Sequence, residues 1–413
     1  MPARRRRTLP AWLVGSGLVA VAMGVMNFGT YGFTILSARL LGPVHYGALA
    51  ALMGLLLIVN VVSLGLQATG ARRVATAPHL THAIESDILR VSYRSALVLA
   101  LLCLVCSPVV SRVLNLDSWL AAALLALAIA PLTLMGGQLG VLQGERRWGP
   151  LALIFVAMGA GRLVLGTAAL VIRPDALGAM AGVAAGAFVP AGVGWFVLRR
   201  PRPSPFAAAG PTPPAQVPSG LVRELAHNSH ALLAFFALSN ADVVLARVVL
   251  DEHDAGLYAG GLILTKAVLF LPQFVVIVAF PAMSNAASAR RAQARSVALV
   301  LAIGAVTMVG VAVLSGLTVV FIGGPGYSAV QGLLWGFAGL GTLLALLQVM
   351  VYQLVARQSA RSVYTIWVAV AVLVAGASRV GTVTDLLVWV SLVDGVLLVV
   401  LLVRNLLPAR SGS

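Results

Sequence analysis

The stretch SARLLGPVHYGALAALMGLLLIVNVVSLGLQ, residues 37–67, contains the junction between two long apolar runs. One run covers residues 12–36 and the other residues 48–68, and the segment between them holds a single arginine, Arg39. A helix that crosses a membrane needs about 20 mostly apolar residues. The stretch therefore predicts two membrane-spanning helices joined by a short turn.

The composition of the whole chain also indicates a membrane protein. Of its 413 residues, 60% are hydrophobic and 10% are charged, whereas about 25% of the residues of a soluble protein are charged. These values exclude a soluble multidomain enzyme and a disordered chain. A transmembrane β-barrel is disfavoured because its strands alternate polar and apolar residues, and the apolar runs here are continuous. We expect an all-α polytopic membrane protein.

Twelve apolar runs predict twelve membrane-spanning helices. They cover residues 12–36, 48–68, 92–111, 118–137, 149–172, 176–198, 226–250, 256–283, 296–321, 329–355, 363–378 and 384–403.

The charges between these runs predict the orientation. Twenty arginines lie in segments on the side of the N-terminus, and four lie in loops on the other side. Arginine-rich loops favour the cytoplasm, so both termini are expected to be cytoplasmic. The net charge of +16 does not indicate nucleic acid, because the basic residues lie in short loops between apolar runs. The near-absence of lysine, with much Ala, Val and Gly, indicates a GC-rich bacterial genome and therefore the bacterial inner membrane.

Residues 199–225 divide the chain. Seven of its 20 prolines fall in this basic segment, which is typical of an extended linker. We expect an N-terminal six-helix bundle over residues 1–198, a cytoplasmic linker over residues 199–225, and a C-terminal six-helix bundle over residues 226–413.

The two halves share a short repeat. ARLLGPVHYGALAAL, from Ala38, aligns with ARVVLDEHDAGLYAG, from Ala246, so that Arg39 matches Arg247. Gly47 then matches Gly256 after one insertion. Six helices per half give both halves the same orientation, which predicts a pseudo-two-fold axis along the membrane normal, as in parallel-repeat transporters.

Four ionisable residues lie near the middle of predicted spans: Arg162, Asp242, Lys266 and Asp394. An ionisable group at this depth costs several kcal/mol and usually faces protein or a water-filled cavity. Two cations and two anions could form two salt bridges. The interpretation we favour is a hydrated cavity whose cations hold an anionic headgroup, with Asp242 and Asp394 as candidates for ion coupling.

Polar stripes on the predicted helices extend this interpretation. The stripes are Asn27, Tyr31 and Thr34 on the first helix, Asn60, Ser63 and Gln67 on the second, and Lys266 with Gln273 on the eighth. They are expected to line a lumen, with hydrogen bonding between helices as the alternative. Gly178, Gly182 and Gly186 instead predict close helix packing.

No catalytic or metal site is expected. The acidic turn at residues 251–254 could serve a membrane glycosyltransferase, but a solvated turn is the simpler interpretation. A Walker A motif does not occur, so ATP is not the direct energy source. No cofactor is expected, and coupling to a proton or sodium gradient or to the membrane potential stays open.

The stretch 37–67 resembles the start of the polysaccharide transporter family, which includes the Wzx-like flippases of the multidrug/oligosaccharidyl-lipid/polysaccharide (MOP) superfamily. That family carries an A-R-x-L-G-x-x-x-Y-G element, here Ala38, Arg39, Leu41, Gly42, Tyr46 and Gly47. A second similarity comprises Asp242, Gly256-Leu257-Tyr258, Lys266, Pro272 and Phe280-Pro281.

The resemblance implies two pseudo-symmetric six-helix bundles in a MATE-like V. It implies transport of polyprenyl-pyrophosphate-linked oligosaccharide from the inner to the outer leaflet by alternating access, in cell-surface polysaccharide biosynthesis. Arg162, Lys266 and Arg247 would then contact the anionic substrate. Implied partners are the lipid bilayer, the polyprenyl-linked glycan, and the polysaccharide polymerase and glycosyltransferases of the same pathway. A MATE-type small-molecule exporter and a polyprenyl-phosphate-dependent membrane glycosyltransferase are the alternatives.

Overall fold

The computed structural model describes the backbone of residues 11–200, 221–283, 289–356 and 360–406. Side chains are described over residues 17–200, 229–269, 297–351 and 363–404. Within these residues every regular element is a helix. The expected linker, residues 199–225, lies largely outside the described residues, so its place as a domain boundary stays a prediction.

The first half contains six α-helices and one short 3₁₀ turn. They are α1 (Ala11–Val59), α2 (Val61–Thr76), η1 (Pro78–Leu80), α3 (Thr81–Val113), α4 (Trp119–Gly144), α5 (Trp148–Ile172) and α6 (Ala176–Arg199). The second half contains α7 (Leu221–Val249), α8 (Glu252–Met283), α9 (Ala289–Val313), α10 (Ser315–Ile322), η2 (Pro325–Leu333), α11 (Leu334–Ala356), α12 (Ala360–Ala377) and α13 (Val383–Leu406).

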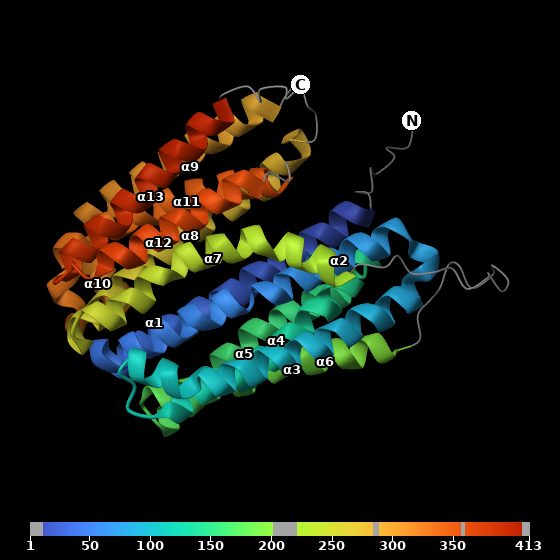
Figure 1. Cartoon of the computed structure of the whole chain (residues 1–413), viewed down its shortest axis with the longest axis horizontal. Helices are drawn as coiled ribbons and strands as arrows, with labels where there is room; N and C mark the ends of the chain where they lie inside the picture. Colours follow the sequence, from blue (N-terminus) through green and yellow to red (C-terminus); the bar gives the residue numbers. More distant parts are fainter. Residues whose placement is uncertain (1–10, 201–220, 284–288, 357–359, 407–413) are drawn as a thin grey trace, which may run out of the picture.

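The turn between the first two spans is tighter than expected. α1 is broken at Gly42, which has φ 65° and ψ 177°, and the chain reverses there (Figure 1). Glycine adopts positive φ without the strain that a Cβ would cause, and Pro43 brings no N–H to continue the helix. The second span therefore begins at Pro43 rather than at residue 48. We call this extremity of the molecule the Gly42 end.

The ninth span also differs from the expected continuous helix over residues 296–321. Val297–Val313 and Ser315–Ile322 meet at an angle of 96°. The bend lies at Leu314, whose φ of −103° and ψ of 31° depart from helical values. No proline or glycine occupies this residue, so the sequence alone gives little sign of the bend.

Length and hydropathy identify eight membrane spans among the described helices, or nine if the bent pair α9–α10 counts as one span. One of the eight, Gly17–Thr76, contains two spans because the chain reverses at Gly42. α8 and the shorter apolar α12 complete the twelve expected spans. Over the residues that the structure describes, the protein is an all-α polytopic membrane protein with twelve spans.

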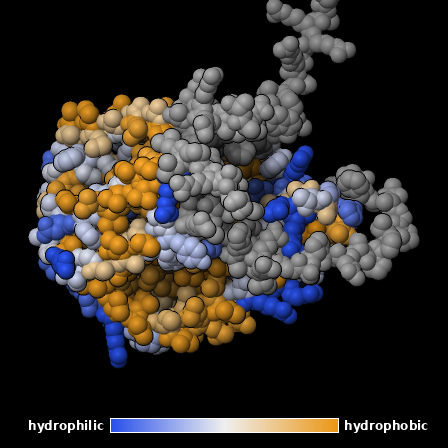
Figure 2. Space-filling view, turned by 45° about the horizontal axis from the view of Figure 1, so that its top comes forward, coloured by the Kyte–Doolittle hydropathy of each residue, from blue (hydrophilic) through white to orange (hydrophobic). Residues whose placement is uncertain are grey.

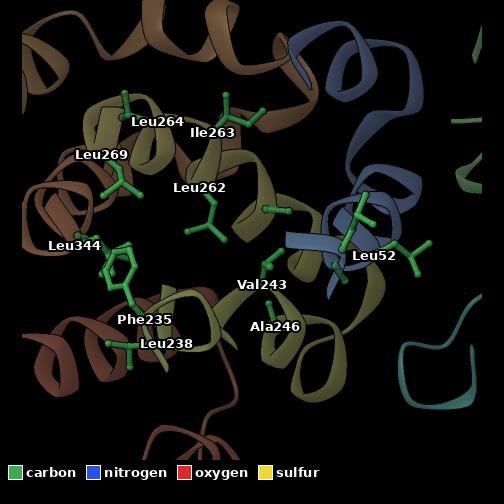
Figure 3. Packing of buried hydrophobic residues seen from close by; sticks show 14 of the residues in the cluster. Leu52, Phe235, Leu238, Val243, Ala246, Leu262, Ile263, Leu264, Leu269 and Leu344 are labelled. Atoms are coloured by element: carbon green, nitrogen blue, oxygen red, sulfur yellow. The ribbon is translucent and has the colours of Figure 1, made fainter. Parts of the chain in front are cut away.

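The helices form two bundles. α3 to α6 pack with α1 and α2, and α8 to α13 pack with α7. In Figure 1 the bundles lie close together at the Gly42 end and diverge toward the end where both termini lie. Contacts of α1 with α7 and α8, and of α2 with α7, join them. Figure 3 shows part of this apolar junction, with Leu52 on α1 and Val243 and Ala246 on α7.

The outer surface is apolar, as a bilayer requires. Large side chains face outward along α3, where Leu101 is 52% and Val105 is 74% exposed. Figure 2 shows hydrophobic residues across the described part of one face, with hydrophilic residues toward its margins.

The glycines of α6 pack as expected. A Cβ added at Gly182 would lie 2.6 Å from Cα of Gly166, and one added at Gly186 would lie 2.8 Å from the carbonyl oxygen of Gly161. α5 and α6 therefore touch through their backbones, which confirms the close packing predicted for Gly182 and Gly186. A Cβ at Gly192, on the same helix, would meet nothing within 4 Å.

We expect Gly182→Ala to destabilise the first bundle, whereas Gly192→Ala should not. Forcing a methyl group against a backbone typically costs about 1–3 kcal/mol. The measurement is the temperature at which the detergent-solubilised protein loses its monodisperse size-exclusion peak after heating. Equal temperatures for the two variants would contradict the packing described here.

Candidate functional site

Lys266 bridges two helices of the second bundle. Its Nζ, on α8, donates hydrogen bonds to the backbone oxygen of Ser239 and to Oδ1 of Asn240, the latter at 3.2 Å, and both residues lie on α7. Lys266 also interacts electrostatically with Asp242 and Asp394. Three of the four ionisable residues predicted to lie in the membrane therefore lie near one another, on α7, α8 and α13.

The two carboxylates of this cluster are buried without full hydrogen bonding. Asp242 and Asp394 are each 1% exposed. Oδ1 of Asp242 accepts the backbone N–H of Val243 at 2.8 Å, while Oδ2 of Asp242 and Oδ1 of Asp394 have no hydrogen-bond donor among the described residues. The buried hydroxyl of Tyr258 also has no hydrogen-bond partner among the described residues. Tyr258 lies near enough to both carboxylates to interact with them electrostatically.

The described part of the structure does not contain the two salt bridges that were the alternative interpretation of the four ionisable residues. Among the described residues, no ion pair joins Lys266 to either carboxylate. One ammonium and two ionised carboxylates would leave a net negative charge in a medium where an uncompensated charge is costly. A proton or a small cation bound by carboxylate and phenol oxygens would remove that excess, and such oxygens are ligands that hard cations prefer.

Arg162 lies apart from this cluster, on α5 in the first bundle. It is half-buried, and no ion pair or hydrogen bond to its guanidinium is found in the part of the chain that the structure describes. Ala160 and Val164 are exposed, and each is two residues, or about 200°, away from Arg162 around the helix. Arg162 therefore lies on the opposite side of α5 from these two exposed residues.

The remaining predicted lumen residues are spread over both bundles. Asn27 and Tyr31 are half-buried on α1. The side chain of Gln273 lies outside the described residues. The lumen role of these three residues stays a prediction.

Two of the three residues in the polar stripe of the second span bond to a neighbouring helix. Ser63 donates to the carbonyl oxygen of Leu132 at 2.7 Å, and Nε2 of Gln67 donates to Oε1 of Gln143 at 3.1 Å. Both acceptors lie on α4, so the alternative interpretation, hydrogen bonding between helices, holds for these two residues. Helical periodicity identifies the face but not the neighbour that the face meets.

Sequence reasoning missed Tyr258 and Asn240 as members of the charged cluster. Tyr258 lies eight residues before Lys266 on α8, so the two share one face of the helix. That spacing was a usable signal. Asn240 could not have been found in this way, because its contact with Lys266 depends on how α7 packs against α8.

Arg247 does not join the cluster either. It is 4% exposed and lies at the Gly42 end, where Nε donates to the carbonyl oxygen of Leu114 and Nη2 donates to that of Asn115, each at 2.9 Å. Nη2 also pairs with Glu252 at 3.0 Å. In this conformation Nε and Nη2 are engaged by protein atoms, while Nη1 has no acceptor among the described residues. Contact with a substrate stays a prediction for Arg247.

The acidic turn at residues 251–254 has structural roles. Glu252 pairs with Arg247, and Oδ1 of Asp251 accepts the backbone N–H of Asp254 at 2.9 Å. The described residues contain no group of three or more His, Cys, Asp or Glu side chains placed to hold a metal ion.

Comparison with known sequences gives a limited result. No protein-family model matches the chain. Uncharacterized proteins of Mycobacterium bovis and Mycobacterium tuberculosis are 28% identical over 268 residues. The match spans 63% of this chain and about 61% of the length of those curated relatives.

Comparison with solved structures identifies the fold. An inward-facing multidrug resistance MATE transporter of the MOP superfamily superposes with a TM-score of 0.69 at 13% identity, covering 94% of this chain and 97% of that one. A eukaryotic MATE transporter gives 0.59 at 14% identity, covering 95% and 96%. A MOP superfamily transporter of Pyrococcus furiosus, described by the reverse polarity of its binding pocket, gives 0.57 at 13%, covering 96% and 94%. The chain therefore has the MATE fold over nearly its whole length.

We expect Lys266→Met to destabilise the protein strongly, since it leaves two buried carboxylates without their cation. The substitution also leaves the backbone oxygen of Ser239 and Oδ1 of Asn240 without their Lys266 donor, and an unsatisfied buried acceptor costs about 1–3 kcal/mol. Asp394→Asn in the same molecule should restore part of the loss, because it removes one of the two negative charges. The measurement is a double-mutant cycle. The temperature at which half of the detergent-solubilised protein has lost its monodisperse size-exclusion peak is compared among the parent protein, the two single variants and the double variant. If the two substitutions change this temperature additively, the electrostatic coupling is contradicted.

Proposed function

We propose that this protein is a membrane transporter that moves a polyprenyl-(pyro)phosphate-linked oligosaccharide from the inner to the outer leaflet by alternating access. The observation that carries the proposal is Arg162, a half-buried cation on α5, on the opposite side of the helix from Ala160 and Val164 and without a protein partner among the described residues. A half-buried guanidinium of this kind is stabilised by an anionic ligand, and arginine matches phosphate with two parallel hydrogen bonds.

The orientation follows from the loop charges. In the sequence, four arginines fall in the loops that follow odd-numbered predicted spans, and twenty fall in the segments on the side of the N-terminus. By the positive-inside rule, the end with both termini lies in the cytoplasm and the Gly42 end faces outward. The protein would then reside in the bacterial inner membrane.

The mechanism uses the divergence of the bundles toward the cytoplasmic end (Figure 1). The headgroup would enter between the bundles, where Arg162 attracts its phosphate oxygens, while the prenyl chain stays in the lipid. Asp242 and Asp394 would take up a proton or a sodium ion, which neutralises the excess negative charge of their cluster. Lys266 would orient the cluster through its bonds to α7. The bundles would then rock around this site to open outward.

An exporter of small molecules is the second candidate. The carboxylate cluster of the second bundle favours it, because buried acidic groups also suit a cationic substrate. The fold is equally compatible with either cargo. A glycosyltransferase is less well supported, because Asp251 and Glu252 serve as hydrogen-bond partners of the protein itself.

We expect Arg162→Gln to reduce glycan transport about tenfold, the loss of one charge-assisted hydrogen bond to phosphate. A deletion strain of the native host carries each variant, and its lipid-linked glycans are tested for protection from an externally added glycan-modifying probe. Failed transport leaves the finished unit protected. The matched control is Arg94→Gln, an exposed arginine on α3. Normal export by the Arg162 variant, at equal membrane abundance, would refute its role.

The same extracts separate the rival functions. Accumulation of an incomplete lipid-linked unit would indicate a glycosyltransferase. Unchanged lipid-linked glycans together with altered drug sensitivity would indicate the exporter.

We expect Asp242→Asn and Asp394→Asn to abolish the response of transport to an imposed proton or sodium gradient, since an amide binds neither ion in this way. The measurement is transport in proteoliposomes with each gradient applied separately. Asp385→Asn, an exposed residue in the first turn of α13, is the control. A gradient response that survives in both variants would exclude the cluster as the coupling site.

A further inference from the structure

Two arginines cross between the bundles at the Gly42 end. Arg39, on α1, donates from Nη2 to the carbonyl oxygen of Val320 on α10 at 2.7 Å. Arg247, on α7, donates in the opposite direction to the carbonyl oxygens of Leu114 and Asn115. Each bundle therefore contributes one guanidinium and receives one.

All three acceptors are backbone carbonyl oxygens at or directly after the C-terminus of a helix. The last four carbonyls of a helix have no donor within it. Val320 belongs to the last four residues of α10, and Leu114 and Asn115 directly follow α3. Asn115 has a φ of 48°, the left-handed conformation that asparagine tolerates better than most residues. Each guanidinium also meets the negative end of a helix dipole.

The two contacts are related by the internal repeat. Arg39 and Arg247 occupy aligned positions in the repeated sequence, each near the end of the first span of its half. Each one reaches the end of the third span of the other half, since α10 continues α9. A rotation of the bundles away from each other would therefore break both contacts together.

Backbone contact accompanies the arginines. A Cβ added at Gly256 would lie 1.9 Å from the carbonyl oxygen of Pro43, and one added at Gly47 would lie 2.9 Å from the nitrogen of Gly256. Gly47 and Gly256 are themselves matched by the repeat. In addition, the hydroxyl of Tyr327 donates to the carbonyl oxygen of Ala38 at 3.1 Å.

We propose that Arg39 and Arg247 form a reciprocal latch that holds the Gly42 end closed, and that opening of this end requires both guanidinium groups to leave the helix ends of the opposite bundle. Gly47 and Gly256 let the backbones approach closely enough for both arginines to reach. The latch assigns gating, rather than substrate contact, to Arg247.

The two halves of the latch are unequal in strength. Arg247 is buried and is further held by Glu252, whereas Arg39 is exposed and bonds one carbonyl. A cation at an exposed helix end is stabilised less than a partly buried one. Loss of Arg247 should therefore open the protein more than loss of Arg39.

The test measures distances across the Gly42 end by double electron–electron resonance in lipid nanodiscs. Spin labels are attached at Asp117→Cys and Gly381→Cys, which are exposed turn residues of opposite halves, after Cys103→Ser and Cys106→Ser. We expect the ratio of long to short distances to rise about threefold in Arg39→Gln and about tenfold in Arg247→Gln, with the product of the two in the double variant.

Two controls keep the test decisive. Arg112→Gln removes an exposed arginine at the same end of α3 and should leave the distances unchanged. Gly256→Ala changes no charge but drives a methyl group into the backbone of Pro43, so it should also populate the long distance. Gly332→Ala, where a Cβ would meet nothing within 4 Å, should not.

An unchanged distance distribution in a folded Arg39→Gln, Arg247→Gln double variant would overturn the latch. So would an equal shift in Arg112→Gln. The latch rests on transport by alternating access but not on the identity of the cargo. A shifted distribution with unaltered lipid-linked glycans would keep the latch and refute the proposed substrate.

Discussion

A polypeptide in a bilayer must satisfy its backbone hydrogen bonds internally, because lipid offers none. Twelve helices meet this requirement along their lengths but leave unpaired carbonyls at their ends. At the Gly42 end, arginines from the opposite bundle bond one such carbonyl, that of Val320 on α10, and the carbonyls of Leu114 and Asn115, which directly follow α3. The interactions that complete the helices therefore also join the two halves.

The lack of hydrogen-bonding partners in lipid also affects the charged cluster of Asp242, Lys266 and Asp394. Lys266 is held by a backbone carbonyl and an amide of α7, while the nearby Asp242 and Asp394 retain oxygens without donors among the described residues. A fully satisfied network would be static. A network that lacks one positive charge can respond to an ion, which is the property that a coupled transporter requires.

The proposed gate, coupling cluster and substrate arginine lie in different parts of the molecule. The gate joins the bundles at the Gly42 end, the cluster belongs to the second bundle, and Arg162 belongs to the first. α7 connects the gate and the cluster, since it carries Arg247 near its end and Asp242 and Asn240 in the cluster. A change in the cluster that shifts α7 would therefore act on the gate through one rigid helix, a short physical route for coupling.

The sequence by itself determined the fold class, the twelve spans and the internal repeat, because each is encoded in composition or in helical periodicity. It also identified Gly182 and Gly186 as packing residues. Only the tertiary structure decided which faces meet. It directed Ser63 and Gln67 to α4, brought Asp242, Lys266 and Asp394 together, separated Arg162 from them, and engaged Arg247 with the end of α3. Periodicity fixes the direction of a side chain around its own helix, whereas its partner depends on how twelve helices pack, and that is set by contacts between residues far apart in the chain.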